Sequence, residues 1–483
     1  MKDQILHTLH ALRSYALGKG YEIELYYQEE SGSLMRFANS AISLNTSDHL
    51  IRLGIQATLG KRQASVSLIT DLSKVDEMKH SIDEAAEMVQ HSQPLTYKPT
   101  VPTYKESFAD ETGYDPVLAE FSGEAKLDYF NRASEDLETP DLRLSGIFSS
   151  GSNTIALTNT HSDHSLYFRT SDAQVTAVLA HAVLKWELIA EQSAQSSSDL
   201  DADPLHHELA FLVGQLQSTQ PEQLPLGSYD IVFGPAAIAE MLGMMNWIGF
   251  DGGLMRRGYS FLQESDIGRR VFSPKFTLVD NPDRLETFPY KVDFTGIPRG
   301  PFPILEKGVF KSFLWSQDSA DEFGATPTGH TVTHKSLVVH GGDCAACSLP
   351  ELISLPRERD VLYVPFLHYM NIVNPTKGLI TASSRFGALL LTGAGSVRIP
   401  FNVRLTQSLL DIFGERVEWL SEATVPYNTT HSYGARNPVA IIVPRFMQVR
   451  GLEISHSNPT FLLIRLFTTW SLEHDSSATK ASR

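Results

Sequence analysis

Tyr229-Asp230-Ile231-Val232-Phe233, followed by the apolar stretch Gly234 to Gly249, decides how this chain divides. The five residues alternate as a strand does, and a break from Pro221 to Gly227 precedes them. Beyond Tyr229, short apolar runs alternate with Gly, Pro and Asp turns, a pattern typical of mainly antiparallel sheet. We therefore predict a domain boundary at the Pro221 to Gly227 break.

The residues before this boundary predict helices mixed with strands. Apolar residues near helical spacing lead to a stop at Gly18-Lys19-Gly20, and short strands should follow as far as Leu68. A helix is expected from about Leu72 to Val89 and another from Leu205 to Leu216.

Two irregular segments are expected within this part. Pro94 to about Pro116 has no apolar period and predicts a connecting loop, and Ser149 to Ser152 predicts a loop between strands. The expected fold class is α+β with two domains. Residues 1–220 form a mixed α/β domain that includes a middle segment from about residue 117, and residues 221–483 form a mainly antiparallel β domain.

Composition excludes several classes of function. The net charge of -16 and pI near 5.5 argue against direct nucleic-acid binding, which depends on clustered Lys and Arg. No run of about 18 apolar residues predicts a membrane span, and the N-terminus does not resemble a signal peptide. Only Cys344 and Cys347 occur, which fits a reducing compartment. We expect a cytoplasmic protein without membrane contact.

Short segments that are typical of one protein family occur in a fixed order between Arg36 and His330. They are Arg36-Phe37-Ala38-Asn39-Ser40, Ile51-Arg52-Leu53-Gly54-Ile55, Gly60 to Ser65, Thr70-Asp71-Leu72-Ser73, Gly227 to Val232, Arg257-Gly258-Tyr259-Ser260-Phe261, Thr277 to Pro282, Asp293-Phe294-Thr295-Gly296-Ile297-Pro298, Glu306 to Val309 and Thr328-Gly329-His330. In this order they resemble the TldD/PmbA family of zinc metallopeptidases, also described as modulators of DNA gyrase.

The resemblance implies a metal motif that this chain lacks. Active members carry His-Glu-x-x-x-His on one helix and a later Cys, which hold Zn²⁺ while the Glu takes a proton from water. The matching positions fall at Gly243, Met244 and Ile248, and the stretch from Gly234 to Gly249 contains no His. Pro426 to Arg450, where the Cys would lie, contains no Cys.

This departure is similar to the TldE (PmbA) branch, which lacks the zinc ligands and pairs with a zinc-bearing TldD-type subunit. The resemblance therefore implies a non-catalytic subunit of a cytosolic peptidase complex acting on extended, unstructured peptides. This chain would contribute no catalytic residue and no cofactor, because the zinc belongs to the partner. An open sheet edge could bind such peptides by strand addition.

Two alternatives remain open. The chain could be a stand-alone peptide-binding or scaffold protein. It could also be a metallopeptidase with relocated ligands, because His330, His334, Cys344 and Cys347 lie near one another in the sequence. The pair His207-Glu208 lacks a second His one turn later and is interpreted as a solvated helix face.

Overall fold

The computed structural model describes residues 1–429 and 436–458. Within these residues the chain forms one seven-stranded, one six-stranded and one nine-stranded sheet. The seven-stranded sheet uses strands between residues 22 and 194, and the other two use strands from residue 227 onward. The predicted α+β class, with an N-terminal mixed part and a C-terminal mainly β part, is confirmed.

The N-terminal part surrounds one sheet with the order β3-β2-β1-β5-β6-β4, and β7 pairs with β6. Its elements are α1 (Lys2–Lys19), β1 (Glu22–Ala38), β2 (Ala41–Leu59), β3 (Arg62–Thr70), α2 (Val75–His91), β4 (Phe108–Gly113), α3 (Pro116–Ala119), α4 (Gly123–Ala133), β5 (Leu142–Asn159), β6 (Leu166–His181), β7 (Glu187–Ala194), η1 (Ser197–Asp199) and α5 (Ala202–Leu216). The first helix ends as predicted, because Gly20 takes the left-handed conformation (φ 73°) that closes a helix at low cost.

One predicted loop is wrong, and another is wrong only in part. Ser149 to Ser152 lies inside β5, where Gly151 faces Gly32 of β1 and Asp172 of β6, so small residues serve close packing rather than a turn. Within Pro94 to Pro116, the strand β4 pairs in parallel with β6. The predicted short strands are in fact long, since β1 spans 17 residues and β2 spans 19.

The C-terminal part contains the other two sheets. Its elements are β8 (Gly227–Phe233), α6 (Pro235–Phe250), α7 (Gly252–Arg256), η2 (Glu264–Asp266), β9 (Leu278–Asp280), η3 (Leu285–Thr287), β10 (Phe302–Glu306), β11 (Val309–Phe310), α8 (Gln317–Phe323), β12 (Leu337–Val339), α9 (Leu349–Ser354), β13 (Val361–Val364), β14 (Phe366–Asn374), η4 (Pro375–Lys377), β15 (Leu379–Arg385), β16 (Leu389–Leu391), β17 (Val397–Arg398), β18 (Asn402–Ser408), α10 (Leu409–Phe413), β19 (Val417–Leu420), β20 (Thr424–Asn428), β21 (Ala440–Pro444) and β22 (Met447–Asn458).

The helix α6 is the centre of this part. Pro235 occupies its first turn, where the missing N–H costs nothing. Most of its side chains are apolar and buried, so α6 packs inside the C-terminal core. The side chains of α6 are therefore held on a rigid element.

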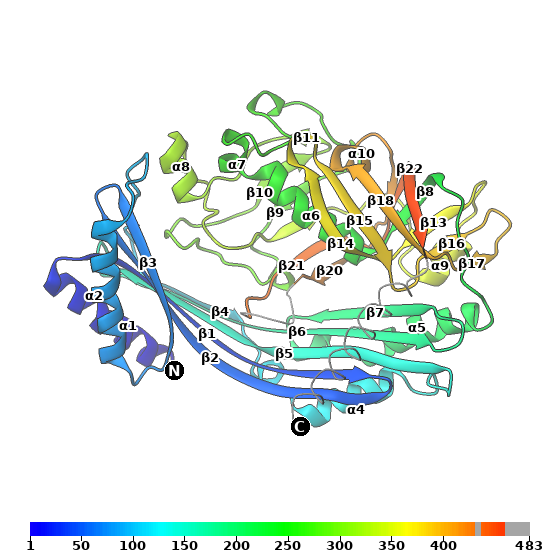
Figure 1. Cartoon of the computed structure of the whole chain (residues 1–483), viewed down its shortest axis with the longest axis horizontal. Helices are drawn as coiled ribbons and strands as arrows, with labels where there is room; N and C mark the ends of the chain where they lie inside the picture. The colour runs from blue at the N-terminus through cyan, green and yellow to red at the C-terminus, as the bar shows by residue number, and fades with distance from the viewer. Residues whose placement is uncertain (430–435, 459–483) are drawn as a thin grey trace, which may run out of the picture.

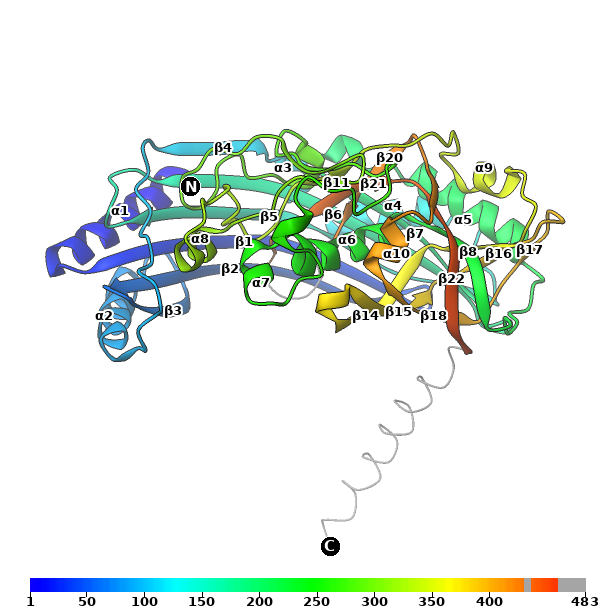
Figure 2. The ribbon, with the colours of Figure 1, turned by 90° about the horizontal axis from the view of Figure 1, so that it is seen from above.

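The C-terminal part lies over the long curved sheet (Figure 1), and the view from above shows it extending along that sheet (Figure 2). Helices α1 and α2 pack near one end of the sheet, and α4 and α5 near the other. One apolar core joins the two parts, because Leu188 and Leu205 pack in the same cluster as Val232, Tyr363 and Phe446. Among the described residues, no helix is both long and apolar enough to cross a bilayer.

Candidate functional site

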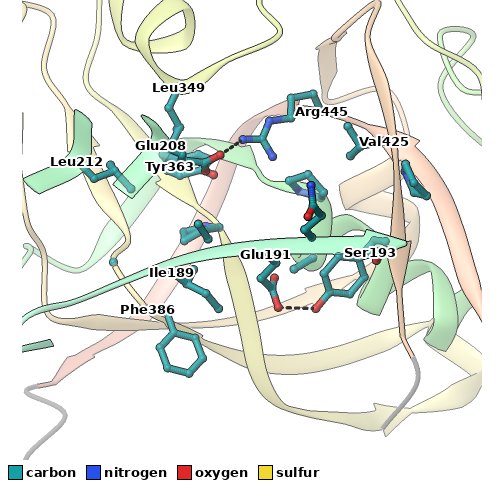
Figure 3. Close-up of a pocket in the computed structure, with 18 residues that line it drawn as sticks. Ile189, Glu191, Ser193, Glu208, Leu212, Leu349, Tyr363, Phe386, Val425 and Arg445 are labelled. Carbon is teal, nitrogen blue, oxygen red and sulfur yellow. Dashed lines mark hydrogen bonds and ion pairs between the residues drawn. The ribbon is translucent and has the colours of Figure 1, made fainter. Parts of the chain in front are cut away.

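A cleft separates strand β7 from the C-terminal part. It contains two adjoining cavities, of about 230 and 460 Å³, whose linings share Ile189, Glu191, Phe386 and Tyr427. Five consecutive residues of β7, 189–193, line the first cavity, so this cavity follows the strand's edge. Figure 3 shows the first cavity, and we call the two cavities together the inter-domain cleft.

The backbone of β7 is open toward this cleft. The N–H of His181 donates to the carbonyl of Trp186 at 2.9 Å, and the same register pairs Leu179 with Leu188 and Ala177 with Ala190. Because hydrogen-bonded pairs alternate in an antiparallel ladder, the peptide groups of the even-numbered residues of β7 point to β6. Those of the odd-numbered residues 187, 189, 191 and 193 point away from the sheet.

A second observation supports this orientation. A Cβ at Gly387, which lies across the cleft, would come within 2.7 Å of the outward carbonyl of Glu187. In the described part of the chain, the backbone groups of Ile189 and Glu191 that point outward have no hydrogen-bond partner. An unpaired edge of this kind is a template for another extended backbone.

Helix α6 forms the opposite wall. Ala236 lines the first cavity, and Glu240 and Met244 line the second. These residues are four apart, so they share one face of the helix. The cleft therefore runs between the face of α6 that carries Ala236, Glu240 and Met244 and the edge of β7.

Glu191 is the carboxylate between these walls. Its Oε1 accepts hydrogen bonds from the hydroxyls of Thr176 (3.2 Å) and Tyr427 (3.5 Å, dashed in Figure 3). Burial and, to a smaller extent, the charge of Glu240 raise the pKa of Glu191 to about 7, although the hydrogen bond from Thr176 opposes this shift. A carboxyl group with this pKa changes its charge near neutral pH, as groups at functional sites often do.

A second carboxylate of the cleft is neutralised within the chain. Glu208 of α5 accepts a hydrogen bond from Nη2 of Arg445 at 2.7 Å, and both side chains are largely buried (Figure 3). The interpretation of His207-Glu208 as a solvated helix face is therefore correct for exposed His207 and wrong for Glu208. Arg445 is committed to Glu208 and leaves Glu191 without a cation.

The three positions that match the lost metal motif do not face one site. Gly243 is exposed, Met244 lines the cleft, and Ile248 is 3% exposed in the C-terminal core. Residues five apart on a helix are about 140° apart around its axis, so Gly243 and Ile248 point in different directions. The face that α6 presents to the cleft begins instead at Ala236 and continues through Glu240 and Met244.

His330 belongs to a buried ion-pair network. Its Nε2 lies 2.8 Å from a carboxylate oxygen of Asp280, and its Nδ1 lies 2.7 Å from the Thr328 hydroxyl. Burial lowers the pKa of His330, so the neutral ring donates to Asp280 and accepts from Thr328. Both ring nitrogens are therefore occupied, and neither is available to a metal.

The other three candidate ligands lie in separate surroundings. The pKa of His334 falls to about 3, chiefly because of burial, and its Nδ1 contacts Thr333. The backbone of Cys344 forms an isolated β-bridge with that of Ser421. Cys347 is exposed and donates its S–H to Glu351. Among residues 1–429 and 436–458, no three His, Cys, Asp or Glu side chains gather closely enough to hold a metal ion.

Sequence reasoning missed the cleft. β7 ends in Gln192-Ser193-Ala194, which has no clear alternation of polar and apolar residues, and Glu191 is one acidic residue among many. The tertiary partner Tyr427 lies 236 residues away. The helical spacing of Ala236, Glu240 and Met244 was the signal that could have identified the cleft-facing side of α6.

Comparisons with known proteins were informative for the fold and the C-terminal part. Residues 226–456 match the model of the PmbA/TldA metallopeptidase C-terminal domain. No curated protein matches the chain. The fold resembles TldE from Thermococcus kodakarensis, with a TM-score of 0.76 and 16% identity over 94% of this chain and 100% of that one.

Two further solved structures have the same fold. Both are named as candidate modulators of DNA gyrase. The Thermotoga maritima protein gives a TM-score of 0.71 and 15% identity over 93% of this chain and 100% of its own. The Bacteroides thetaiotaomicron protein gives a TM-score of 0.74 and 16% identity over 93% of this chain and 98% of its own.

Proposed function

Because the chain belongs to the TldD/PmbA family through its C-terminal domain, we propose that it is a non-catalytic, peptide-binding subunit of a TldD/TldE-like metallopeptidase complex. The zinc would be held by a TldD-type partner. Extended, unstructured peptides would bind in the inter-domain cleft of this chain.

The open edge of β7 is the observation that carries the proposal. A strand can add to an edge only where outward N–H and C=O groups are unpaired and where space lies beside them. β7 meets both conditions, because its odd-numbered residues point into the inter-domain cleft. Main-chain pairing is insensitive to most side chains, which suits unstructured peptides of varied sequence.

The side chains of α6 support a non-catalytic role. A zinc peptidase needs imidazole or thiolate ligands on a rigid wall of the cleft. α6 presents Ala236, Glu240 and Met244 there, and its sequence from Pro235 to Phe250 contains neither His nor Cys. The relocated-ligand alternative loses support, since both ring nitrogens of His330 are occupied.

Strand addition predicts a proline effect at Ile189. Ile189→Pro removes an outward N–H and places the proline ring toward the incoming strand, while leaving the bonds to β6 intact. We expect an extended peptide to bind about tenfold more weakly, the equivalent of ~1.4 kcal/mol. Fluorescence anisotropy with a labelled, unstructured peptide measures this change.

Two variants provide the controls. Ile189→Ala removes the side chain but keeps the N–H, so its peptide affinity should stay within about threefold of the original. Ala190→Pro removes a group that points to β6 and should lower thermal stability instead. Equal affinities for Ile189→Pro and Ile189→Ala would rule out strand addition at this edge.

The partner half of the proposal has its own test. The chain is mixed with the zinc-bearing TldD-type protein of the same host, and complex formation is followed by size-exclusion chromatography. We expect co-elution and about a tenfold rise in cleavage of an unstructured peptide, while the chain alone neither cleaves peptide nor retains stoichiometric zinc. Two separate peaks at micromolar concentration, with an unchanged cleavage rate, would contradict the complex and favour a stand-alone peptide-binding protein.

A further inference from the structure

Within the described residues, only one oxygen of the Glu191 carboxylate accepts hydrogen bonds. Both hydroxyl donors, from Thr176 and Tyr427, contact the same oxygen, Oε1. In the part of the chain that the structure describes, Oε2 receives no hydrogen bond and Glu191 forms no ion pair. Glu191 lines both cavities of the cleft, so a ligand bound there lies beside this carboxylate. Partly buried carboxylates normally have cationic partners.

Aromatic rings stand around this carboxylate. Phe366, Tyr369, Phe386 and Tyr427 line the same cavity as Glu191, and the rings of Phe366 and Phe386 pack edge to face with centroids 5.5 Å apart. Aromatic faces attract cations, and they also cover the methylene stem of a long basic side chain. Glu240 adds a second carboxylate to the lining. The cavity therefore combines negative charge with aromatic walls.

Register places one peptide side chain beside Glu191. The peptide groups of Glu191 point to the open edge, so an added antiparallel strand would pair one residue directly with it. Paired residues project to the same face, with Cβ atoms about 5 Å apart. The side chain of that peptide residue would enter the cavity that contains the free Oε2.

We infer that the inter-domain cleft contains a subsite for a Lys or Arg side chain, with Glu191 as its counter-charge and the aromatic rings as its walls. This inference rests on the proposed function, because the side chain is delivered by a peptide on the edge of β7. An ammonium or guanidinium group donates a charge-assisted hydrogen bond to Oε2, the carboxylate oxygen that otherwise accepts none. The cleft then selects peptides that carry a basic residue at one position, although their remaining sequence varies.

A matched set of peptides tests the subsite. The probes are acetylated, amidated peptides of about nine residues, the length of a strand, built from Thr and Ser around a central Lys, Arg, norleucine or Glu. Affinities are measured by fluorescence anisotropy at pH 8, where Glu191, with a pKa of about 7, is ionised. We expect the Lys and Arg peptides to bind about tenfold more tightly than the norleucine peptide, and the Glu peptide to bind weakest.

Two variants show whether Glu191 is responsible. In Glu191→Gln the preference for Lys over norleucine should disappear, while affinity for the norleucine peptide stays the same and so reports an intact cleft. Glu222→Gln is the matched control, because Glu222 does not line either cavity of the cleft and forms an ion pair with Arg398. That variant should keep the full preference for Lys.

The outcomes separate this inference from the proposed function. Equal affinities for Lys and norleucine peptides would overturn the subsite but leave peptide binding standing. A norleucine peptide with a free α-amino group gives a further check. If it binds about tenfold more tightly than the acetylated norleucine peptide, Glu191 binds the peptide's N-terminus, and the side-chain subsite is overturned. If none of the peptides binds, both proposals fail.

Discussion

Arg299→Met is expected to lower the free energy of unfolding by about 3–5 kcal/mol, because it leaves a buried carboxylate without its cation. Nη2 of Arg299 contacts both oxygens of Asp280, at 2.9 and 2.7 Å, and these side chains are 2% and 1% exposed. Chemical denaturation measures the loss. The exposed pair Arg256 and Glu264 gives the control, and Arg256→Met should cost less than about 1 kcal/mol.

The effect of Arg299→Met should depend on pH. Burial alone would raise the pKa of Asp280, but His330 and Arg299 lower it to about 2. A carboxylate with a lowered folded pKa contributes stability above its unfolded pKa of about 4 and loses it as pH falls toward 2. The gap between the original chain and Arg299→Met should therefore narrow between about pH 4 and pH 2. A gap that stays constant over this range would contradict the assigned role of Asp280.

A double variant separates charge burial from packing. Asp280→Asn with Arg299→Met removes the orphaned charge and should recover part of the lost stability. This network also positions the neighbouring loop, since Arg299 donates to the carbonyl of Tyr290, and Tyr290 packs on Phe168 of the N-terminal sheet. Its loss would therefore weaken the contact between the two parts of the chain.

The sequence predicted elements whose signals are local. The spacing of Leu205 to Leu216 identified most of α5, and the stop at Gly18 to Gly20 identified the end of α1, because both depend on periodicity or on a single conformationally free residue. The prediction of a loop at Ser149 to Ser152 was wrong because it, too, relied only on a local signal. Glycine and serine usually indicate turns, but here they allow β5 to lie between close neighbours on both sides.

The candidate site could not be predicted in the same way. Its elements meet only in the folded chain, since β7, α6 and β20 supply Glu191, Met244 and Tyr427 from distant parts of the sequence. The resemblance pointed to α6 as the important helix. It did not reveal which face of α6 lines the cleft, because matching the positions along the sequence does not say which way each side chain points in the folded chain.

The inter-domain cleft exists only while the two parts of the chain stay docked, and Arg436 joins them. Its Nη2 lies 2.7 Å from Asp172 of β6, which is 1% exposed, and its Nη1 donates to Ser149 of β5 at 2.9 Å. The absence of side chains at Gly32 and Gly151 makes room for this arginine, because an added Cβ would come within 3.1 and 3.0 Å of its guanidinium group. A side chain from the C-terminal part is thus enclosed within the N-terminal sheet.

Arg436→Met should therefore affect both stability and binding. We expect the free energy of unfolding to fall by about 3 kcal/mol, because Asp172 is left buried without its paired cation. Lys126 is the other buried cation near Asp172, and burial together with the charge of Arg436 lowers its pKa to about 7. Removing Arg436 raises the pKa of Lys126, so Lys126 compensates in part for the lost cation. We also expect the affinity for the Lys-centred peptide to fall at least about tenfold. The reason is that the cleft lies between β7 of the N-terminal part and α6 of the C-terminal part, and Arg436 holds these two parts together.

The control and the double variant separate these two effects. Arg398→Met removes an exposed ion pair with Glu222 and should change stability by less than about 1 kcal/mol and leave peptide affinity unchanged. Adding Asp172→Asn to Arg436→Met removes the unpaired charge and should recover stability without restoring the enclosed arginine. If the peptide affinity stays low in that double variant, the enclosed Arg436 side chain itself is needed to hold the two walls of the cleft at the right distance. If affinity recovers together with stability, its role is confined to neutralising Asp172.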